Sequence, residues 1–268
     1  MTKHIKIGII NISNPSISFD SIANCVDKLK ECNIEIADYC GDHSSSISRF
    51  KLCLQDKSIS IIWLLTGGIN IIKINFKELV SLRHPTKILI GSSDITHLFI
   101  SVTKTTLRYY YFTNFLDFLN TRTIQEVAQQ IYMFTEKSSN TLTVFDSYRL
   151  PHKIDILAYQ IVGGHSVISS LFLGGKIHQT TKPLIYFWEH HYSTFESLEL
   201  FEYWLNVFFM KCKEYHISIV LIGNSQIWNL EKDMYHTFDE QIDVIIKLGY
   251  IEMQIYFINQ TKTPIPLQ

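Results

Sequence analysis

The sequence predicts an α/β protein whose N-terminal part is a Rossmann-like, mostly parallel sheet. Apolar, β-branched segments with almost no polar alternation recur at residues 5–12, 59–65 and 87–90. Segments with helical apolar spacing, such as residues 22–29, separate them. Repeated alternation of strands and helices favours parallel strands covered on both faces. We therefore expect ligands at the carboxyl ends of these strands.

Further elements complete the alternation in the first half of the chain. A turn at residues 14–16 ends the first strand, and Gly67-Gly68 ends the strand at 59–65. An aromatic strand at 109–112 is interpreted as buried, with a substrate-stacking surface as the alternative. The remaining predicted elements are a short strand at 34–36 and helices at 47–54 and 73–82.

The second half predicts a smaller α+β domain. The pattern becomes irregular after about residue 101, so we place a linker region at 116–155, between an N-terminal domain at 1–115 and a C-terminal domain at 156–268. The C-terminal elements are a strand ending at Gly163-Gly164, a helix from His165, a strand at 184–188 and a long amphipathic helix. Ser193 and Thr237 are candidate helix caps, and Gly249 ends the last helix.

Composition and spacing exclude several classes of function. Lys and Arg number 24 against 25 Asp and Glu, whereas nucleic-acid binding needs a concentrated positive field, so no nucleic-acid partner is expected. No apolar run approaches the ~18 residues that span a bilayer, so we expect no membrane partner and a cytoplasmic protein. Metal-ligand, GxGxxG and Walker patterns are missing, so no metal and no cofactor are predicted. The five cysteines lack CxxC spacing and are interpreted as buried reduced thiols.

Ser93 stands at a predicted turn from a strand into a helix. A helix N-terminus offers free N–H groups and a positive dipole to a developing oxyanion, so a serine here can serve as a nucleophile. Ser and Asp are also ordinary helix N-cap residues, and a glycine pair such as Gly67-Gly68 is often a simple turn. Both interpretations stay open at this point.

The order of the motifs resembles one known family. A strand with a Pro-Ser turn at residues 9–16 is followed by Arg49 ahead of an apolar strand, a glycine loop at 66–70, and the turn Gly91-Ser92-Ser93-Asp94-Ile95-Thr96. In the second half, residues 163–166 and 187–189 match two further motifs. In this order the segments resemble the LD-carboxypeptidase and microcin immunity family of serine peptidases, over nearly the whole chain.

The resemblance implies a mechanism and a set of residues. Ser93 attacks a peptide carbonyl after a histidine takes its proton, and Glu189 orients that histidine. The N–H groups of Asp94 and Gly68 form the oxyanion hole. Gly67, Ser92 and Gly164 are the implied substrate-binding residues. The resemblance also implies a homodimer and a site in a cleft between two domains.

The chain departs from the family at the catalytic base. Family members carry a Gly-His pair shortly before a Pro-containing terminal stretch, which residues 265–267 resemble here, yet no histidine follows His236. The loop arginine of the family is Thr66, and an asparagine of the second domain is His165. Three changes around one cleft indicate altered function.

Four other histidine positions could supply a base. His165 faces the predicted cleft, with a structural or surface role as the alternative. His190 and His191 follow Glu189, and at most one of them shares its face of the strand, but the favoured interpretation of both is solvated loop histidines. His97 lies one turn after Ser93, where packing against the sheet is favoured.

Two functions fit these residues. The first is a serine hydrolase or acyl-transfer enzyme that acts through Ser93, Glu189 and His165 on an amide or ester bond of a peptide-like small molecule, near a free carboxylate. Muropeptides and peptide-nucleotide antibiotics are the substrates that the resemblance suggests. The second is a pseudoenzyme that keeps the cleft for binding a peptide or partner.

Overall fold

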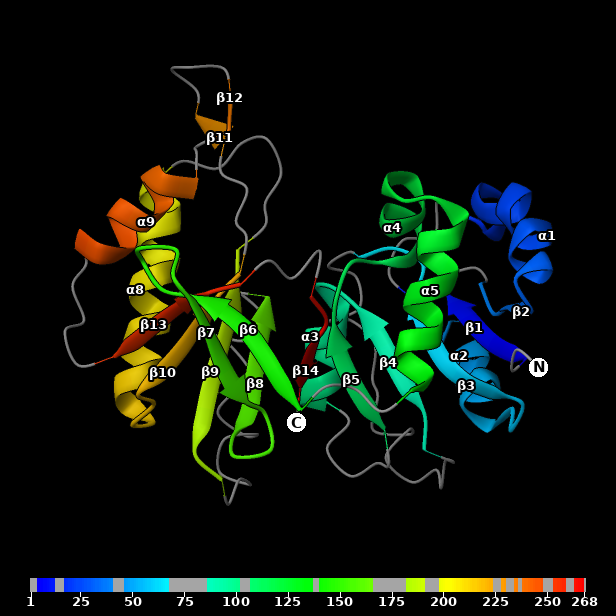
Figure 1. Ribbon diagram of the computed structural model, residues 1–268, viewed down its shortest axis with the longest axis horizontal. Helices are drawn as coiled ribbons and strands as arrows, with labels where there is room; N and C mark the ends of the chain where they lie inside the picture. The colour runs from blue at the N-terminus through cyan, green and yellow to red at the C-terminus, as the bar shows by residue number, and fades with distance from the viewer. Residues whose placement is uncertain are drawn as a thin grey trace. The chain divides into compact units, whose positions relative to one another are not determined.

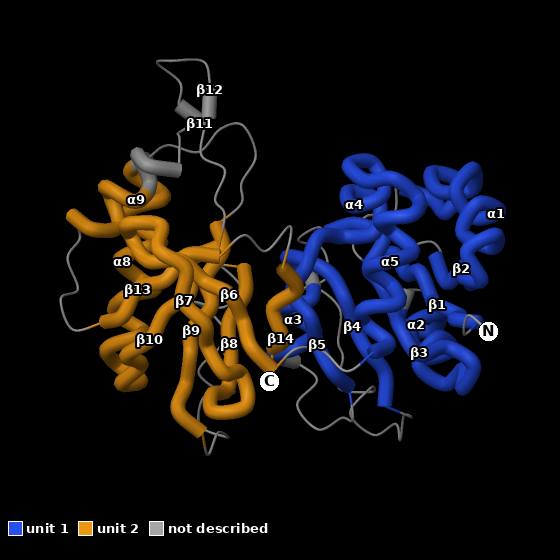
Figure 2. Tube along the Cα trace, in the orientation of Figure 1, with its two compact units in different colours: residues 1–139 blue, residues 140–268 orange. Residues whose placement is uncertain are grey.

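The structure, a computed structural model of the 268-residue chain, forms two compact units, residues 1–139 and 140–268 (Figure 2). Each unit has its own sheet and helices, and each is described by itself. The residues that the structure describes are 4–12, 17–40, 46–67, 86–101, 107–136, 140–165, 182–190, 198–223, 228–229, 234–235, 238–247, 253–258 and 263–267.

The first unit is a parallel sheet with helices, as the sequence predicts (Figure 1). Its strands are β1 (Ile5–Ile10), β2 (Ile34–Asp38), β3 (Ile59–Leu64), β4 (Ile88–Gly91) and β5 (Arg108–Tyr111). They lie in the order β2-β1-β3-β4-β5, and every neighbouring pair is parallel. The chain changes direction across the sheet between β1 and β3, the place where doubly wound sheets bind ligands at their carboxyl edge.

Six helical segments accompany this sheet in the part of the unit that the structure describes. They are η1 (Phe19–Ile22), α1 (Ala23–Glu31), α2 (Ser46–Gln55), α3 (Asp94–Ser101), α4 (Phe115–Thr121) and α5 (Ile124–Thr135). Helix α5 begins with a complete capping box, in which Thr123 accepts from the backbone of Glu126 and the Glu126 carboxylate accepts from the backbone of Thr123. Local sequence alone therefore sets the start of α5.

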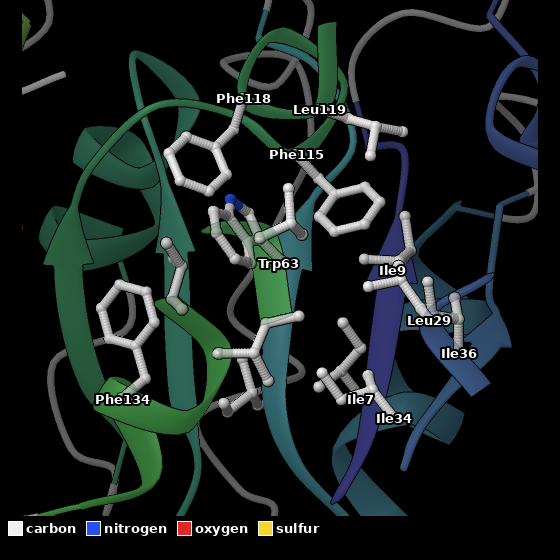
Figure 3. Close-up of a cluster of buried hydrophobic side chains, with 14 of the residues drawn as sticks. Ile7, Ile9, Leu29, Ile34, Ile36, Trp63, Phe115, Phe118, Leu119 and Phe134 are labelled. Atoms are coloured by element: carbon white, nitrogen blue, oxygen red, sulfur yellow. The ribbon is translucent and has the colours of Figure 1, made fainter. Parts of the chain in front are cut away.

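The core of the first unit is built around Trp63 in β3 (Figure 3). Its fully buried ring lies 5.4 Å from Phe115, 5.5 Å from Phe118 and 5.7 Å from Phe134, between ring centres. The indole N–H donates to the backbone carbonyl of Thr113 at 2.9 Å. Trp63 therefore fixes β3 against α4 and α5 by apolar packing and against the segment after β5 by a hydrogen bond.

The second unit contains a mixed sheet that is mostly parallel. Its strands are β6 (Thr141–Phe145), β7 (Pro151–Asp155), β8 (Gln160–His165), β9 (Leu184–Glu189), β10 (Ile219–Ile222) and β13 (Gln254–Phe257), in the order β7-β6-β13-β10-β9-β8. The four strands from β13 to β8 are parallel, while β6 is antiparallel to both of its neighbours. The unit also contains α8 (Leu198–Glu214), α9 (Phe238–Lys247), the short pair β11 (Trp228–Asn229) and β12 (Met234–Tyr235), and β14 (Ile265–Leu267). Two mostly parallel sheets with helices confirm the predicted α/β class.

The organisation of the middle of the chain differs from the prediction. The segment 116–155, predicted as a linker region, contains most of α4, all of α5, and strands β6 and β7. The two compact units divide between residues 139 and 140, within this segment. The irregular pattern after residue 101 predicts a linker here, but α5 packs its apolar face on Trp63.

Several predicted features lie outside the described residues. These are the turn at 14–16, Gly68, the helix at 73–82, His191, and the helix signals at Ser193, Thr237 and Gly249. The cysteines are free, and Cys40, Cys53 and Cys212 are buried, which confirms the interpretation as reduced thiols for these three. Among the described residues, no helix is long and apolar enough to cross a membrane.

Replacing the central ring of the first core tests this packing. Trp63→Ala removes a fully buried indole and its hydrogen bond, so it is expected to lower the free energy of unfolding by about 3–5 kcal/mol. Urea-induced unfolding followed by circular dichroism measures the change. Leu52→Ala is the control, because Leu52 lies in the same unit with 58% of its surface exposed, and its replacement is expected to cost about 0.5 kcal/mol or less. Equal losses in the two variants would contradict the packing described here.

Candidate active site

Ser93 lies in a sharp turn between β4 and α3. Gly91 is the last residue of the strand and Asp94 the first of the helix. The backbone of Ser93 has φ +45°, in the left-handed region that residues other than glycine rarely adopt. The carbonyls of Ser92 and Ser93 accept from the N–H groups of Ile95 and Thr96, so both residues close the first turn of α3. The serine is thus displayed at the carboxyl end of a parallel strand, and its side chain is partly exposed.

Two buried side chains from the segment around β5 hold this turn. The Tyr111 hydroxyl oxygen accepts from the N–H of Ser93 at 3.1 Å. The Asn114 carboxamide oxygen accepts from the N–H of Ser92 at 3.0 Å, and its amide nitrogen donates to the Ser92 hydroxyl at 2.7 Å. Tyr111 is fully buried and Asn114 nearly so. The aromatic strand is therefore buried, as the favoured interpretation predicts.

Glycines allow the neighbouring segments to approach the turn closely. A Cβ atom on Gly67, just after β3, would lie 3.0 Å from the Asn114 amide nitrogen and 3.4 Å from the Ser93 Cβ. A Cβ atom on Gly91 would lie 2.8 Å from the side chain of Leu64. The structure therefore brings the predicted residues Gly67, Ser92 and Ser93 together at one edge of the sheet. Asp94 joins them through its backbone, and Gly68 lies outside the described residues.

Thr66 occupies the loop position where the resemblance implies an arginine. It is buried, and its hydroxyl lies 3.3 Å from the Asn11 carboxamide oxygen. The Asn11 amide nitrogen donates to the carbonyl of Ile17 at 2.6 Å. Asn11 follows β1 and Thr66 follows β3, so this pair bridges the two strand ends where the sheet changes direction. A neutral hydrogen-bonded contact here replaces the charge that an arginine would bring.

Glu189 and His165 are partners in the second sheet. Both close their strands, and the parallel register of β8 and β9 places His165 next to Glu189. Adjacent strands lie about 4.8 Å apart, so the two residues are neighbours at the carboxyl edge. His165 is 8% exposed and Glu189 5% exposed. The helix predicted to begin at His165 is wrong at this residue, because β8 continues through the glycine pair.

The glycine pair before His165 has an unusual backbone. Gly163 has φ +114° and Gly164 has φ +129°, and residues with a Cβ atom rarely adopt such values. A Cβ atom on Gly163 would also overlap the carbonyl oxygen of Phe187 in the neighbouring strand. These two glycines let β8 pair closely with β9 up to its last residue. Gly164, a predicted substrate-binding residue, pairs with Trp188, next to the His165 and Glu189 pair.

His190 has a packing role, contrary to the prediction of a solvated loop histidine. It is fully buried, and its ring stacks on Trp188 with 5.2 Å between centres and 15° between planes. The edge of Phe201 in α8 packs against it at 5.3 Å. Because side chains alternate along a strand, Trp188 and His190 share the face that α8 covers, and Glu189 points to the other face.

His97 in α3 is buried as well, in agreement with the favoured packing interpretation. Burial lowers the pKa of its imidazole. A neutral ring is consistent with packing against the sheet. Within the part of the chain that the structure describes, no group of three His, Cys, Asp or Glu residues could hold a metal ion.

Comparison with known families agrees with the motifs. Residues 7–112 match the family model of the LD-carboxypeptidase N-terminal domain. A comparison with curated proteins found no match. The resemblance predicted from the sequence is confirmed by this match and by the solved structures that share the fold.

Three solved structures illustrate the shared fold. The microcin C7 self-immunity protein MccF, as a mutant in complex with adenosine monophosphate, is 14% identical with a TM-score of 0.70, over 100% of this chain and 92% of its own. An MccF-like protein from Bacillus anthracis is 19% identical with a TM-score of 0.65, over 97% and 88%. A muramoyltetrapeptide carboxypeptidase from Oxalobacter formigenes is 12% identical with a TM-score of 0.62, over 98% and 92%. Together with the family match, they support a carboxypeptidase-like hydrolase as the class of protein.

Replacing Gly163 tests the backbone at the end of β8. Gly163→Ala is expected to lower the free energy of unfolding by at least ~2 kcal/mol, because the new methyl group meets a backbone carbonyl and the positive φ becomes strained. Ile161→Val in the same strand is the control and is expected to cost about 1 kcal/mol. Both values come from urea titrations. A Gly163→Ala variant as stable as Ile161→Val would show that the strand can relax its backbone.

Proposed function

We propose that the protein is a serine hydrolase or acyl-transfer enzyme that acts on an amide or ester bond of a peptide-like small molecule. Ser93 is the nucleophile, His165 the general base, and Glu189 the carboxylate that orients the base. The N–H groups of Asp94 and Gly68 are the proposed oxyanion hole. The observation that carries the proposal is the left-handed turn at Ser93, at the carboxyl end of a parallel strand and the start of a helix.

The geometry of the turn supports a nucleophile over a simple helix cap. An N-cap residue normally has an extended backbone, whereas Ser93 has φ +45°. Strained backbone of this kind costs roughly 1–3 kcal/mol, and it occurs mainly where function requires it. The same turn places the N-terminus of α3, with its positive dipole, next to the serine, where negative charge develops during attack on a carbonyl.

The second sheet supports His165 as the base. A serine hydroxyl is a weak nucleophile until a neighbouring group takes its proton, and an imidazole does this best when a carboxylate orients it. The β8 and β9 register gives His165 such a neighbour in Glu189. Strand β14, which follows the position of the terminal histidine in the family, contacts β8. An imidazole at the end of β8 is therefore proposed to replace the family's terminal one.

The substrate class comes from the relatives. One is an immunity protein against a microcin, in complex with adenosine monophosphate, and another is named for a muramoyl tetrapeptide. A peptide-nucleotide or a muropeptide with a free carboxylate near the scissile bond is the proposed substrate. The altered site, with Thr66 at the arginine position, favours a specialised peptide product over a wall fragment. A cytoplasmic homodimer is part of the same proposal.

An active-serine probe tests the nucleophile. A fluorophosphonate is expected to label the protein at Ser93, as located by peptide mass spectrometry, and Ser93→Ala is expected to abolish labelling. Ser92→Ala is the neighbouring control for the identity of the modified residue, because it should keep a labelled site at position 93. A wild-type protein that stays unlabelled from neutral to alkaline pH would contradict the proposed enzyme.

Two histidine variants test the base. His165→Ala is expected to lower the rate constant for Ser93 labelling by about 100-fold or more, because general-base assistance is worth at least that much. His190→Phe is the matched control, since a phenyl ring keeps the stacking on Trp188, and labelling is expected to stay within about twofold of wild type. Equal labelling of the two variants would exclude His165 as the base.

The alternative function is a pseudoenzyme that binds a peptide or partner. The observation that favours it is the absence of any histidine after His236, because a family member without its base loses several powers of ten in rate. Isothermal titration with a muropeptide and with a peptide-nucleotide separates the two functions. Tight binding without turnover supports the pseudoenzyme, and turnover that Ser93→Ala abolishes supports the enzyme.

A further inference from the structure

We propose that Asn114 and Tyr111 are the positioning residues of the nucleophile, which hold residues 92 and 93 in the conformation that presents the Ser93 hydroxyl. This inference rests on the proposed function of Ser93. Three hydrogen bonds carry it: two between Asn114 and Ser92, and one from the N–H of Ser93 to the Tyr111 hydroxyl. Neither residue contacts substrate in this proposal, so both act through the turn.

The orientation of Asn114 is the first argument. Asn114 is the N-cap of α4, with φ -63° and ψ 157°, and asparagine is among the best capping residues. The Asn114 side chain nevertheless makes no capping hydrogen bond to α4. The carboxamide is turned instead to Ser92, where it satisfies one donor and one acceptor. Helix α5 is the contrasting case, because the side chain of its N-cap residue, Thr123, forms a complete capping box.

The burial of both side chains is the second argument. Tyr111 is 0% exposed and Asn114 is 3% exposed. In such a site water does not replace a lost partner, so each hydrogen bond constrains the backbone strongly. A serine with φ +45° needs this constraint, because its left-handed backbone is unfavourable by itself. Asn114 thus holds Ser92, and Tyr111 holds Ser93.

The occupied N–H of Ser93 has a chemical consequence. Because this group donates to the Tyr111 oxygen, it is committed before any substrate arrives. The developing oxyanion must then be stabilised by other donors, which is compatible with the proposed N–H groups of Asp94 and Gly68. Tyr111 thereby selects which N–H groups point toward the reacting carbonyl, and it leaves the Ser93 hydroxyl to the base.

Asn114 also connects the turn to the glycine loop. The Asn114 amide nitrogen lies 3.0 Å from the position that a Cβ atom of Gly67 would take. Two backbone hydrogen bonds near Asn114 fix its place: Phe118 donates to the Asn114 carbonyl, and Leu116 donates to Leu65 in the segment before Gly67. The carboxamide therefore spans the ends of β3 and β4, the two strands that carry the proposed loop and nucleophile.

Labelling kinetics of two variants test the inference. Asn114→Ala and Tyr111→Phe are each expected to lower the maximal rate constant for fluorophosphonate labelling of Ser93 at least tenfold. The probe concentration at half-maximal rate is expected to change less than threefold, because the reaction step is affected and binding is not. Melting temperatures are measured for every variant, so that loss of fold is distinguished from loss of positioning.

Two matched controls separate positioning from general stability. Thr123→Ala removes the cap of α5 and is expected to lower the melting temperature while labelling stays within twofold of wild type. Tyr110→Phe removes a hydroxyl from the adjacent position of β5 and is expected to leave labelling unchanged. If Asn114→Ala does not fold, Ser92→Ala removes the hydroxyl partner of the same hydrogen bond, and a loss of at least threefold in the labelling rate constant is expected.

Amide hydrogen exchange keeps this test independent of the proposed function. The N–H groups of Ser92 and Ser93 are expected to exchange at least tenfold faster in Asn114→Ala and Tyr111→Phe, respectively, than in wild type. If wild type is not labelled but these amides lose protection, the enzyme proposal fails and the positioning role stands. Wild-type labelling rates in both variants, or unchanged exchange where wild type is unlabelled, would overturn the inference.

Discussion

The left-handed backbone of Ser93 is the constraint on which the proposed active site depends. A serine at φ +45° is unfavourable unless its surroundings compensate for it, and here buried side chains hold the turn in addition to the first hydrogen bonds of α3. The Tyr111 hydroxyl and the Asn114 carboxamide take up the N–H groups of residues 93 and 92. The display of the serine is thus a property of tertiary packing.

That packing leads back to the aromatic core of the first unit. Trp63 donates to the carbonyl of Thr113, one residue before Asn114, and its ring packs against Phe115, one residue after it. One indole therefore holds the residues on both sides of Asn114. Gly91 and Gly67 complete the arrangement, because a methyl group on either would meet a neighbouring side chain. The core thus sets the position of the site as well as the stability of the unit.

Much of the fold and part of the site could be predicted from sequence. The buried strands have strong local patterns, whereas Ser93 is singled out only by the resemblance of residues 91–96 to a family motif. Asn114 is not singled out, because it lies 22 residues from Ser92 and the contact depends on the pairing of β4 with β5. His190 was assigned to a solvated loop, although continued alternation after Trp188 would have placed it on the covered face. The adjacency of His165 and Glu189 is a matter of strand register, which motif spacing does not determine.

The turn that presents Ser93 is held by residues of the first unit. Every hydrogen bond described around it, and both glycines that make room for it, belong to residues 63–118. The imidazole and carboxylate proposed to serve it belong to the other unit. Because of this division, the base and carboxylate can change without any change in the residues that hold Ser93. A proton acceptor can therefore change its strand while the turn at Ser93 stays the same, and the proposed base at His165 is compatible with a sequence that has no histidine after His236.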